Sequence, residues 1–179
     1  MNDATSPLQR EFQVPLLGLT LLLRPVEQAD FEALYACASD PLIWEQHPQS
    51  TRYQRDVFQG FFDGAIASKG ALVVIERASG DVIGSSRYYD FDESRSQVTI
   101  GYTFLARRFW GGAVNREMKG LMLRHAFQFV EHVHFEIGAN NRRSRRAIEK
   151  LGATLVDEQT LDGNAHVVYR IDKSSYAPA

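Results

Sequence analysis

Three consecutive β-rich segments with short connections constrain the fold of this chain most strongly. Residues 71–76 and 82–89 are rich in β-branched and aromatic side chains, and Ser79-Gly80-Asp81 between them predicts a hairpin turn. A further strand is predicted over 97–105, with Val98, Ile100, Tyr102 and Phe104 on one face. Strands connected this closely pair antiparallel, so we expect a mostly antiparallel sheet.

The segments on both sides of these strands alternate between helical and strand patterns. Before them we expect a strand over 19–24, a helix over 31–38, and a second helix that follows the capping-box pattern Thr51-Arg-Tyr-Gln54 and ends at Lys69-Gly70. After them we expect a helix over 113–130, a strand over 133–138, a short helix over 142–150, and strands over 154–160 and 166–171 joined by Asp162-Gly163-Asn164. This order predicts a mixed α+β fold, in which a central twisted sheet of about seven strands is flanked by about four helices.

Length and composition favour one soluble domain. The chain has 179 residues, of which 44% are hydrophobic and 23% charged, which excludes disordered and coiled-coil classes. A chain of this length can bury a core without disulfides or metals. We therefore expect a flexible N-terminal segment over 1–15, a single domain over 16–173 and a C-terminal tail over 174–179.

Charge, cysteine content and hydropathy argue against several classes of partner. A net charge of −2 provides no positive field for non-specific nucleic-acid binding. Cys37 is the single cysteine, so no internal disulfide and no Cys/His metal site are expected, and a reducing cytoplasm is the predicted location. The most apolar stretch, 14–23, contains Pro15 and Gly18 and is too short to span a membrane. No secretory signal is expected either.

The connection between the strand at 97–105 and the long helix contains Trp110-Gly111-Gly112-Ala113. Small residues let the backbone approach a ligand closely, and a helix start presents unpaired N–H groups at the positive end of the helix dipole. This pattern favours a phosphate-binding turn. A plain strand-to-helix turn explains the glycine pair equally well.

Two segments, taken together with the order of elements, resemble a known family. The first is 102–117, Tyr-Thr-Phe-Leu-Ala-Arg-Arg-Phe-Trp-Gly-Gly-Ala-Val-Asn-Arg-Glu, and the second is Asn141-Arg-Arg-Ser144 followed by Glu149-Lys-Leu-Gly-Ala153. The combination resembles the GNAT superfamily of N-acetyltransferases, and most of all its RimJ/RimL-like branch of ribosomal-protein N-terminal acetyltransferases. The resemblance extends from about residue 18 to residue 171 and implies the GNAT-like acyl-CoA N-acyltransferase fold.

The resemblance implies that acetyl-CoA, the acetyl donor, binds between the strands at 97–105 and 133–138 without a metal. Its pyrophosphate would lie on the turn from Trp110 to Asn115, whereas a literal match to the family's glycine pattern starts at Arg108. In the preferred placement Ala113 stands where a glycine is usual, and Asn115 where a small residue is usual. The implied CoA-binding residues are Thr103, Phe104, Leu105, Trp110, Gly111, Gly112, Ala113, Val114, Asn115, Asn141 and Ser144.

The reaction that the resemblance implies is direct attack of a neutral amine on the thioester in a ternary complex. The amine must first lose a proton, and Glu136 is the candidate base, acting through water, although its side chain also fits a plain outward position on a strand. The Thr103 N–H would face the thioester oxygen. Ser144 is the candidate acid for the CoA thiolate, or else an ordinary first-turn residue. Asn141 is a pantetheine contact, the N-cap of the helix over 142–150, or both. Two positions where relatives carry acid–base groups hold Thr99 and Ile148.

The acceptor amine is expected where the loop at 41–53 meets the strand end at 87–90. Such a site uses aromatic faces and hydrogen-bond acceptors. The candidate lining residues are Trp44, Glu45, His47, Arg87 and Tyr89, and an ordinary surface is the alternative for each. A basic cluster of Arg142, Arg143, Arg145 and Arg146 is interpreted as a contact for the CoA 3′-phosphate or as a solvated helix face.

These observations support an N-acetyltransferase that transfers the acetyl group of acetyl-CoA to a primary amine of a protein N-terminus or a small molecule. The alternative is a catalytically weak CoA-binding sensor or interaction module on the same fold. Neither hypothesis includes a nucleic-acid or membrane partner, and both are compatible with a homodimer.

Overall fold

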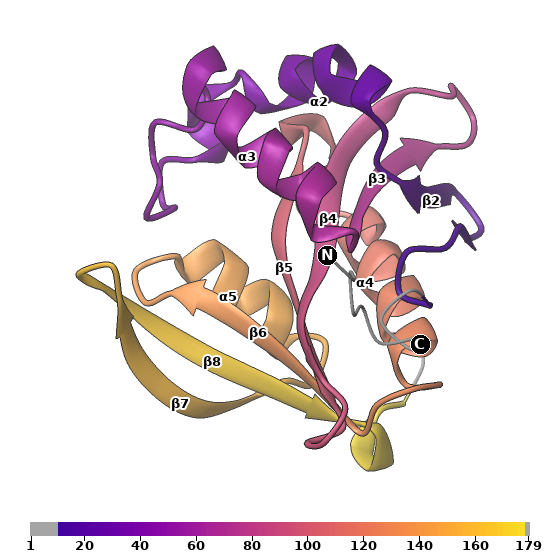
Figure 1. The fold of residues 1–179 in the computed structure, drawn as a ribbon, viewed down its shortest axis with the longest axis vertical. Helices are drawn as coiled ribbons and strands as arrows, with labels where there is room; N and C mark the ends of the chain where they lie inside the picture. Colours follow the sequence, from indigo (N-terminus) through magenta and orange to yellow (C-terminus); the bar gives the residue numbers. More distant parts are fainter. Residues whose placement is uncertain (1–10, 178–179) are drawn as a thin grey trace, which may run out of the picture.

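The computed structural model describes residues 11–177, and one eight-stranded sheet forms their centre (Figure 1). The strands lie side by side in the order β1-β2-β3-β4-β5-β6-β8-β7. Their bounds are Leu16–Leu17 (β1), Leu21–Pro25 (β2), Ala71–Glu76 (β3), Val82–Asp92 (β4), Gln97–Leu105 (β5), His132–Gly138 (β6), Thr154–Leu161 (β7) and Asn164–Asp172 (β8). The mixed fold with a central sheet is therefore confirmed, and the short β1 adds an eighth strand to the seven expected.

Every neighbouring pair in the sheet is antiparallel except β5 and β6. These two strands run parallel and pair only at their beginnings, from Gln97–His132 to Thr99–His134. Beyond this point they spread apart, and Figure 1 shows the divergence from a common end at the bottom of the view. Because β6 pairs along its length with β8 instead, the second half of β5 has no strand partner on its β6 side.

Four α-helices flank the sheet in the described chain: α2 (Phe31–Ala38), α3 (Arg55–Ser68), α4 (Ala113–Ala126) and α5 (Arg142–Glu149). Short 3-10 turns precede or follow them: η1 (Gln28–Asp30), η2 (Pro41–Ile43), η3 (Arg107–Phe109) and η4 (Lys173–Ser175). Strand β3 separates two cores, because Val73 packs with α2 and α3 while Leu72 and Val74 pack with α4. The alternation of side chains along a strand produces this division.

The α4 core contains Met118 and Met122, both fully buried. It also contains Phe12, which is 1% exposed and whose ring centroid lies 5.1 Å from that of Tyr88. The described part of the expected flexible segment, 11–15, therefore packs on the domain. At the other end Tyr176 packs on Phe127, with ring centroids 5.2 Å apart. Residues 1–10 and 178–179 of the two terminal segments lie outside the described residues.

A β-bulge in β5 corrects the expectation that its four large side chains share one face. Val98 and Ile100 face the α4 core, but Phe104 joins the core of α2 and α3. The register explains the change, since Ser85 pairs with Phe104 and Arg87 pairs with Gly101. Two residues of β5 therefore oppose one residue of β4, which exchanges the faces of all later side chains.

Several expected boundaries also change. Helix α3 begins at Arg55, and no side chain caps its start, because Gln54 is extended and Thr51 lies in a separate turn closed by the bond from the Gln54 N–H to the Thr51 oxygen. Helix α4 ends at Ala126 instead of 130, since the chain tightens there into short-range turn bonds. The last hairpin is as expected, with positive φ angles of 49° at Asp162 and 75° at Gly163.

Candidate functional site

The unpaired edge of β5 carries backbone groups that face the gap toward β6. The carbonyl oxygen of Phe104 points at β4, where a Cβ on Gly84 would collide with it. Successive residues of a strand direct their backbone groups to opposite sides, so those of Thr103 and Leu105 point into the gap. The Leu105 oxygen accepts the indole N–H of Trp110 at 3.0 Å. An extended segment of a ligand can therefore pair with the backbone groups of this edge.

The bulge itself places Tyr102 and Thr103 opposite Ser86. Tyr102 has a φ angle of 51°, a left-handed conformation that a tyrosine rarely adopts. Strain of this kind persists where the surrounding structure holds it, and it occurs often at functional sites. It directs the Tyr102 ring, 42% exposed, to the face opposite α4.

The turn before α4 has the features that the sequence predicted for an anion site. Gly111 has a φ of 71°, and a Cβ on Gly111 or Gly112 would meet no atom within 4 Å, so the space in front of the turn is open. Gly112 is the N-cap of α4 and supplies no side-chain capping bond. Within residues 11–177, no turn or loop hydrogen bond occupies the N–H groups of Gly111 and Gly112, and residues 113–115 form the first turn of α4, whose N–H groups have no i−4 partner within the helix. Unpaired amides and the positive helix end together suit a phosphate group.

The start of α5 lies next to this turn. The Oδ1 of Asn141 accepts the Ser144 N–H at 3.1 Å, which confirms the expected N-cap, and the guanidinium carbon of Arg143 lies 3.8 Å from the centroid of the Trp110 ring. The same guanidinium donates to the Ile43 oxygen at 3.0 Å. Arg143 therefore connects α5, the glycine turn and the loop after α2.

The other arginines of the α5 cluster divide into two kinds. Arg145 donates to the hydroxyl of Tyr169 at 3.1 Å and to the Ala139 oxygen at 2.9 Å, so it has a structural role. Arg142 and Arg146 are exposed. A role for them at the CoA 3′-phosphate stays a prediction.

Glu136 lies on the face of β6 opposite the α4 core, since its neighbours Phe135 and Ile137 are buried in that core. Its Oε2 accepts the hydroxyl of Tyr89 at 3.4 Å. Burial, and then the charge of Glu136, raise the pKa of Tyr89, so the tyrosine stays protonated and donates. The Tyr89 ring packs edge-on against Tyr102 with centroids 5.1 Å apart. The candidate base thus lies beside the β-bulge.

Three of the expected acceptor residues meet around a residue that sequence reasoning missed, Arg52. Its guanidinium carbon lies 5.1 Å from the Trp44 ring and 4.6 Å from the Phe61 ring, and its NH1 lies 3.4 Å from Nε2 of His47. Burial, the charge of Arg52 and that of His166 lower the pKa of His47 to about 3, so this imidazole is neutral at pH 7. Arg87 stacks on Phe61 from β4.

The remaining acceptor candidates lie at the borders of this cluster. Tyr89 joins it through Tyr102, whose ring centroid is 4.0 Å from the guanidinium carbon of Arg87. Glu45 does not join it, because its carboxylate lies 3.7 Å from Arg143 instead. Trp44 is fixed within the cluster by its indole N–H, which donates to the Ala38 oxygen at 2.7 Å.

A buried lysine under the bulge was also missed. Lys119 on α4 is 3% exposed, and its Nζ donates to Thr103 Oγ1 at 2.6 Å and to Ser86 Oγ at 3.2 Å. Burial lowers its pKa to about 7. A lysine on an amphipathic helix is normally predicted to be exposed to solvent. Lys119 is buried instead, because the face exchange at the bulge turns the Thr103 hydroxyl toward α4, where it accepts the ammonium.

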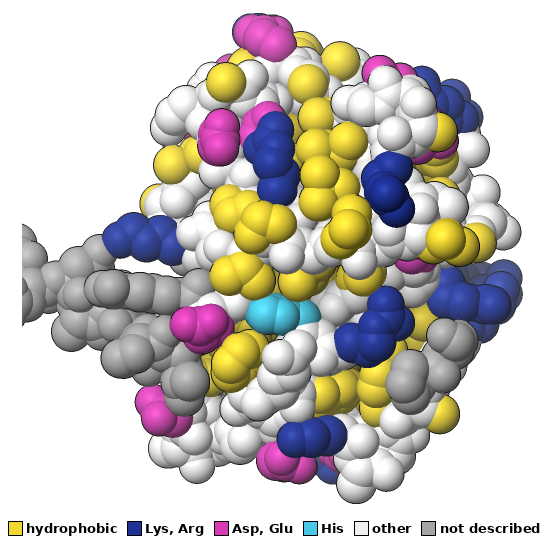
Figure 2. All heavy atoms as spheres, turned by 90° about the vertical axis from the view of Figure 1, so that its right-hand side faces the viewer, with side chains coloured by type: hydrophobic (Ala, Val, Ile, Leu, Met, Phe, Trp, Pro, Cys, Tyr) yellow, Lys and Arg dark blue, Asp and Glu magenta, His cyan; other side chains and the backbone are white. Residues whose placement is uncertain are grey.

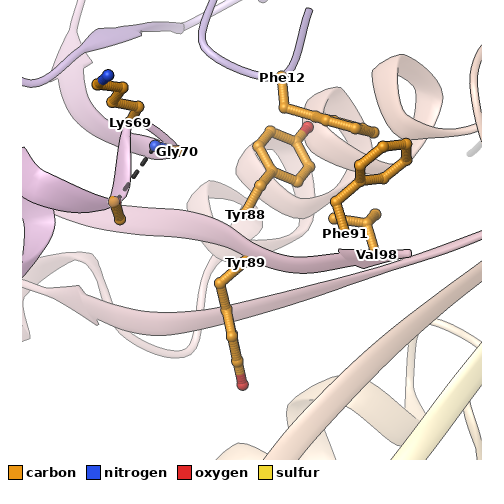
Figure 3. A pocket seen from close by; sticks show the side chains of 8 residues that line it. Phe12, Lys69, Gly70, Tyr88, Tyr89, Phe91 and Val98 are labelled. Atoms are coloured by element: carbon orange, nitrogen blue, oxygen red, sulfur yellow. Dashed lines mark hydrogen bonds between the residues drawn. The ribbon is translucent and has the colours of Figure 1, made fainter. Parts of the chain in front are cut away.

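A small hollow on the α4 side of β4 shares only Tyr89 with these residues. It is lined by Phe12, Ser68, Lys69, Gly70, Tyr88, Tyr89, Phe91 and Val98. Figure 3 shows that Tyr88, Phe91 and Phe12 gather on one side of β4, whereas the Tyr89 side chain extends to the other side. Aromatic packing fills this hollow, and the candidate site lies beyond Tyr89.

The side-chain clusters, the helices and the surface add three negative observations. Within residues 11–177 no group of three His, Cys, Asp or Glu side chains has a geometry that could hold a metal ion, and no helix there is long and apolar enough to cross a bilayer. On the face toward α4 and β2, Lys and Arg side chains are distributed among apolar and acidic ones, with no single basic patch (Figure 2).

Comparisons with known proteins agree on the fold. The model of the acetyltransferase (GNAT) domain matches residues 20–154. Among solved structures, a GCN5-related N-acetyltransferase from Brucella melitensis has a TM-score of 0.77 and 21% identity over 90% of this chain and 80% of that chain. RimJ from Mycobacterium smegmatis, in complex with CoA-disulfide, has a TM-score of 0.72 and 16% identity over 92% of this chain and 90% of that one. Spermidine N-acetyltransferase from Vibrio cholerae, in complex with CoA and spermine, has a TM-score of 0.69 and 15% identity over 88% of this chain and 98% of that one.

Proposed function

The chain belongs to the GNAT acetyltransferase family, and from this premise we propose that it transfers the acetyl group of acetyl-CoA to a primary amine. One observation carries the proposal: the first amides of α4 follow Gly111 and Gly112, where the space is open, and the free edge of the preceding strand β5 faces the β5–β6 gap. A phosphate group and an extended amide-bearing arm would satisfy both sets of backbone groups at once.

The residues available for acetyl-CoA are those predicted from the sequence. The amides of Gly111 to Asn115 would hold the pyrophosphate, and the backbone groups of Thr103 and Leu105 would pair with the pantetheine arm. Asn141 and Ser144, at the start of α5, would contact the same cofactor. When bound, acetyl-CoA supplies the acetyl group as a reactive thioester.

Glu136 is the proposed base that takes the proton of the acceptor amine. An α-amino group has a pKa near 8 and a lysine amine near 10.4, so most amines arrive protonated at neutral pH. The carboxylate of Glu136 accepts such a proton directly or through one water, and the hydroxyl of Tyr89 fixes its orientation.

Ser144 and Thr103 are the other two residues proposed to take part in catalysis. Within the described part of the chain the Ser144 hydroxyl has no hydrogen-bond partner, which leaves it free to donate to the departing thiolate. The Thr103 N–H faces the gap, where it would donate to the thioester oxygen. Membership of the RimJ/RimL-like branch, a cytoplasmic location and a homodimer stay predictions.

Calorimetric titration with acetyl-CoA, followed by detection of free CoA thiol in the presence of amines, tests the proposal. The amine panel includes amino acids, polyamines, aminoglycosides and N-terminal peptides. Binding with thiol release on one amine class is the expected result. Binding without release on any class favours the CoA-sensor alternative, and absence of binding contradicts the proposed function.

A further inference from the structure

Two arginine side chains in the cluster around Phe61 are buried without an acidic partner. Arg52 is 9% exposed and Arg87 is 7% exposed. Among the described residues neither forms an ion pair with an aspartate or glutamate, and the Nε of Arg87 has no hydrogen-bond partner at all. Buried charges in proteins are normally paired, because desolvation of an unpaired charge costs several kcal/mol.

Aromatic rings and neutral polar groups, but no anionic side chain, surround the two guanidinium groups. Both stack on the ring of Phe61, with guanidinium carbons 4.6 Å and 5.6 Å from its centroid. Their polar contacts are the Phe61 oxygen, 3.3 Å from Arg87, and the neutral His47, 3.4 Å from Arg52. Burial, and further the positive charge of Arg87, lower the pKa of Arg52 to about 10, so both groups remain charged at neutral pH.

The pair is connected by contact to the residues proposed for proton transfer. Arg87 stacks on Tyr102 at 4.0 Å, Tyr102 packs against Tyr89, and Tyr89 donates to Glu136. These side chains all lie on the face of the sheet opposite α4. An amine near Glu136 would therefore lie on the same face of the sheet as the Arg87 guanidinium.

We propose, on the basis of the proposed function, that the acceptor amine also carries an anionic oxygen group, a carboxylate or a phosphate, that binds between Arg52 and Arg87. Arginine is suited to this role because its planar fork matches carboxylate and phosphate oxygens. The anion would supply an acidic partner for two guanidinium groups that otherwise lack one. The same pair repels a polycationic acceptor, so this chain would not use polyamines.

Matched acceptors on the unaltered chain give the first test. Thiol release from acetyl-CoA is measured for each amino acid and for its carboxamide, which keeps the amine and removes the anion, and for phosphate-bearing amines such as phosphoethanolamine. We expect kcat/KM to fall at least about 30-fold from the preferred anionic amine to its neutral analogue. The better of the carboxylate and phosphate series identifies the source of the anion. Equal or faster reaction of neutral amines or polyamines would overturn the proposal.

Variants give the second test. Arg52→Met and Arg87→Met should each lose about 30-fold in kcat/KM for the anionic amine and little for its carboxamide, with acetyl-CoA affinity retained as the check of folding. Arg55→Met is the matched control, because Arg55 follows three residues later, is exposed and pairs with Glu32. An equal loss on both acceptors in the Arg52 and Arg87 variants would indicate a structural role and contradict the proposal.

Direct binding separates this proposal from the proposed function. Titration of the protein–CoA complex with the amino acids and phosphate-bearing amines needs no turnover. Binding of anionic amines that Arg87→Met weakens, in a protein that releases no thiol, would contradict the acetyltransferase function and support the anion site. If amines react but neutral analogues bind as tightly as anionic ones, the function stands and the anion site fails.

Discussion

The Nζ atom of Lys119 lies 2.6 Å from Oγ1 of Thr103, under the bulge of β5, and no carboxylate pairs with this ammonium within residues 11–177. Burial lowers the pKa of Lys119 from 10.5 to about 7. Between these pH values the unfolded chain binds a proton that the folded chain does not, so the free energy of unfolding rises with pH in this window. Below pH 7 both states are protonated, and the cost of burying the charge is present in full.

Lys119→Met removes this cost and keeps most of the side-chain volume. We expect the variant to be more stable than the unaltered chain by about 1–4 kcal/mol at pH 6, because uncharged residues of similar size often replace buried charges favourably. The gain should shrink toward pH 10, where the folded lysine is already neutral. Urea unfolding at both pH values measures it, and a gain independent of pH would show that Lys119 does not titrate as described.

Gly111→Asp should abolish acetyl-CoA binding. The substitution places a carboxylate against the amides proposed for the pyrophosphate, and it adds a side chain at a φ angle of 71°. Gly80→Asp is the matched control, since Gly80 has a φ of 77° and open space but lies in the β3–β4 hairpin. Both variants carry a similar backbone cost of about 1–2 kcal/mol. Calorimetry that finds unchanged acetyl-CoA affinity in Gly111→Asp would exclude this turn as the phosphate site.

Glu136→Gln should lower kcat at pH 7 by about 100-fold or more, the range for loss of a general base. Acetyl-CoA affinity should change little, because Glu136 is not among the residues proposed to bind acetyl-CoA. Glu131→Gln, which alters an exposed glutamate near the start of β6, serves as the control. If turnover in Glu136→Gln equals that of the unaltered chain, another group accepts the proton.

Local sequence signals were sufficient for much of the fold. The Asp162-Gly163 hairpin, the Asn141 N-cap and the glycine turn before α4 depend on residues close in sequence, and the structure has them where they were predicted. The family resemblance added the position of the proposed cofactor gap, which depends on two strands far apart in sequence.

The missed residues depend on long-range geometry. The bulge at Tyr102 exchanges the faces of β5, so alternation alone placed Phe104 with Ile100 and gave no reason for Lys119 to be buried. Arg52 lies in a turn that resembles a helix cap, and only the packing of Trp44 and Phe61 around it shows that it is buried. Neither feature has a local sequence signal.

Amine-dependent release of CoA from acetyl-CoA, with the acetylated product identified by mass spectrometry, tests the central claim most directly. We predict that the unaltered chain forms one acetylated amine for each CoA released, on at least one anionic amine, and that Gly111→Asp forms none. Binding of acetyl-CoA with no acetylated product from any amine class would contradict the claim that this chain is an acetyltransferase.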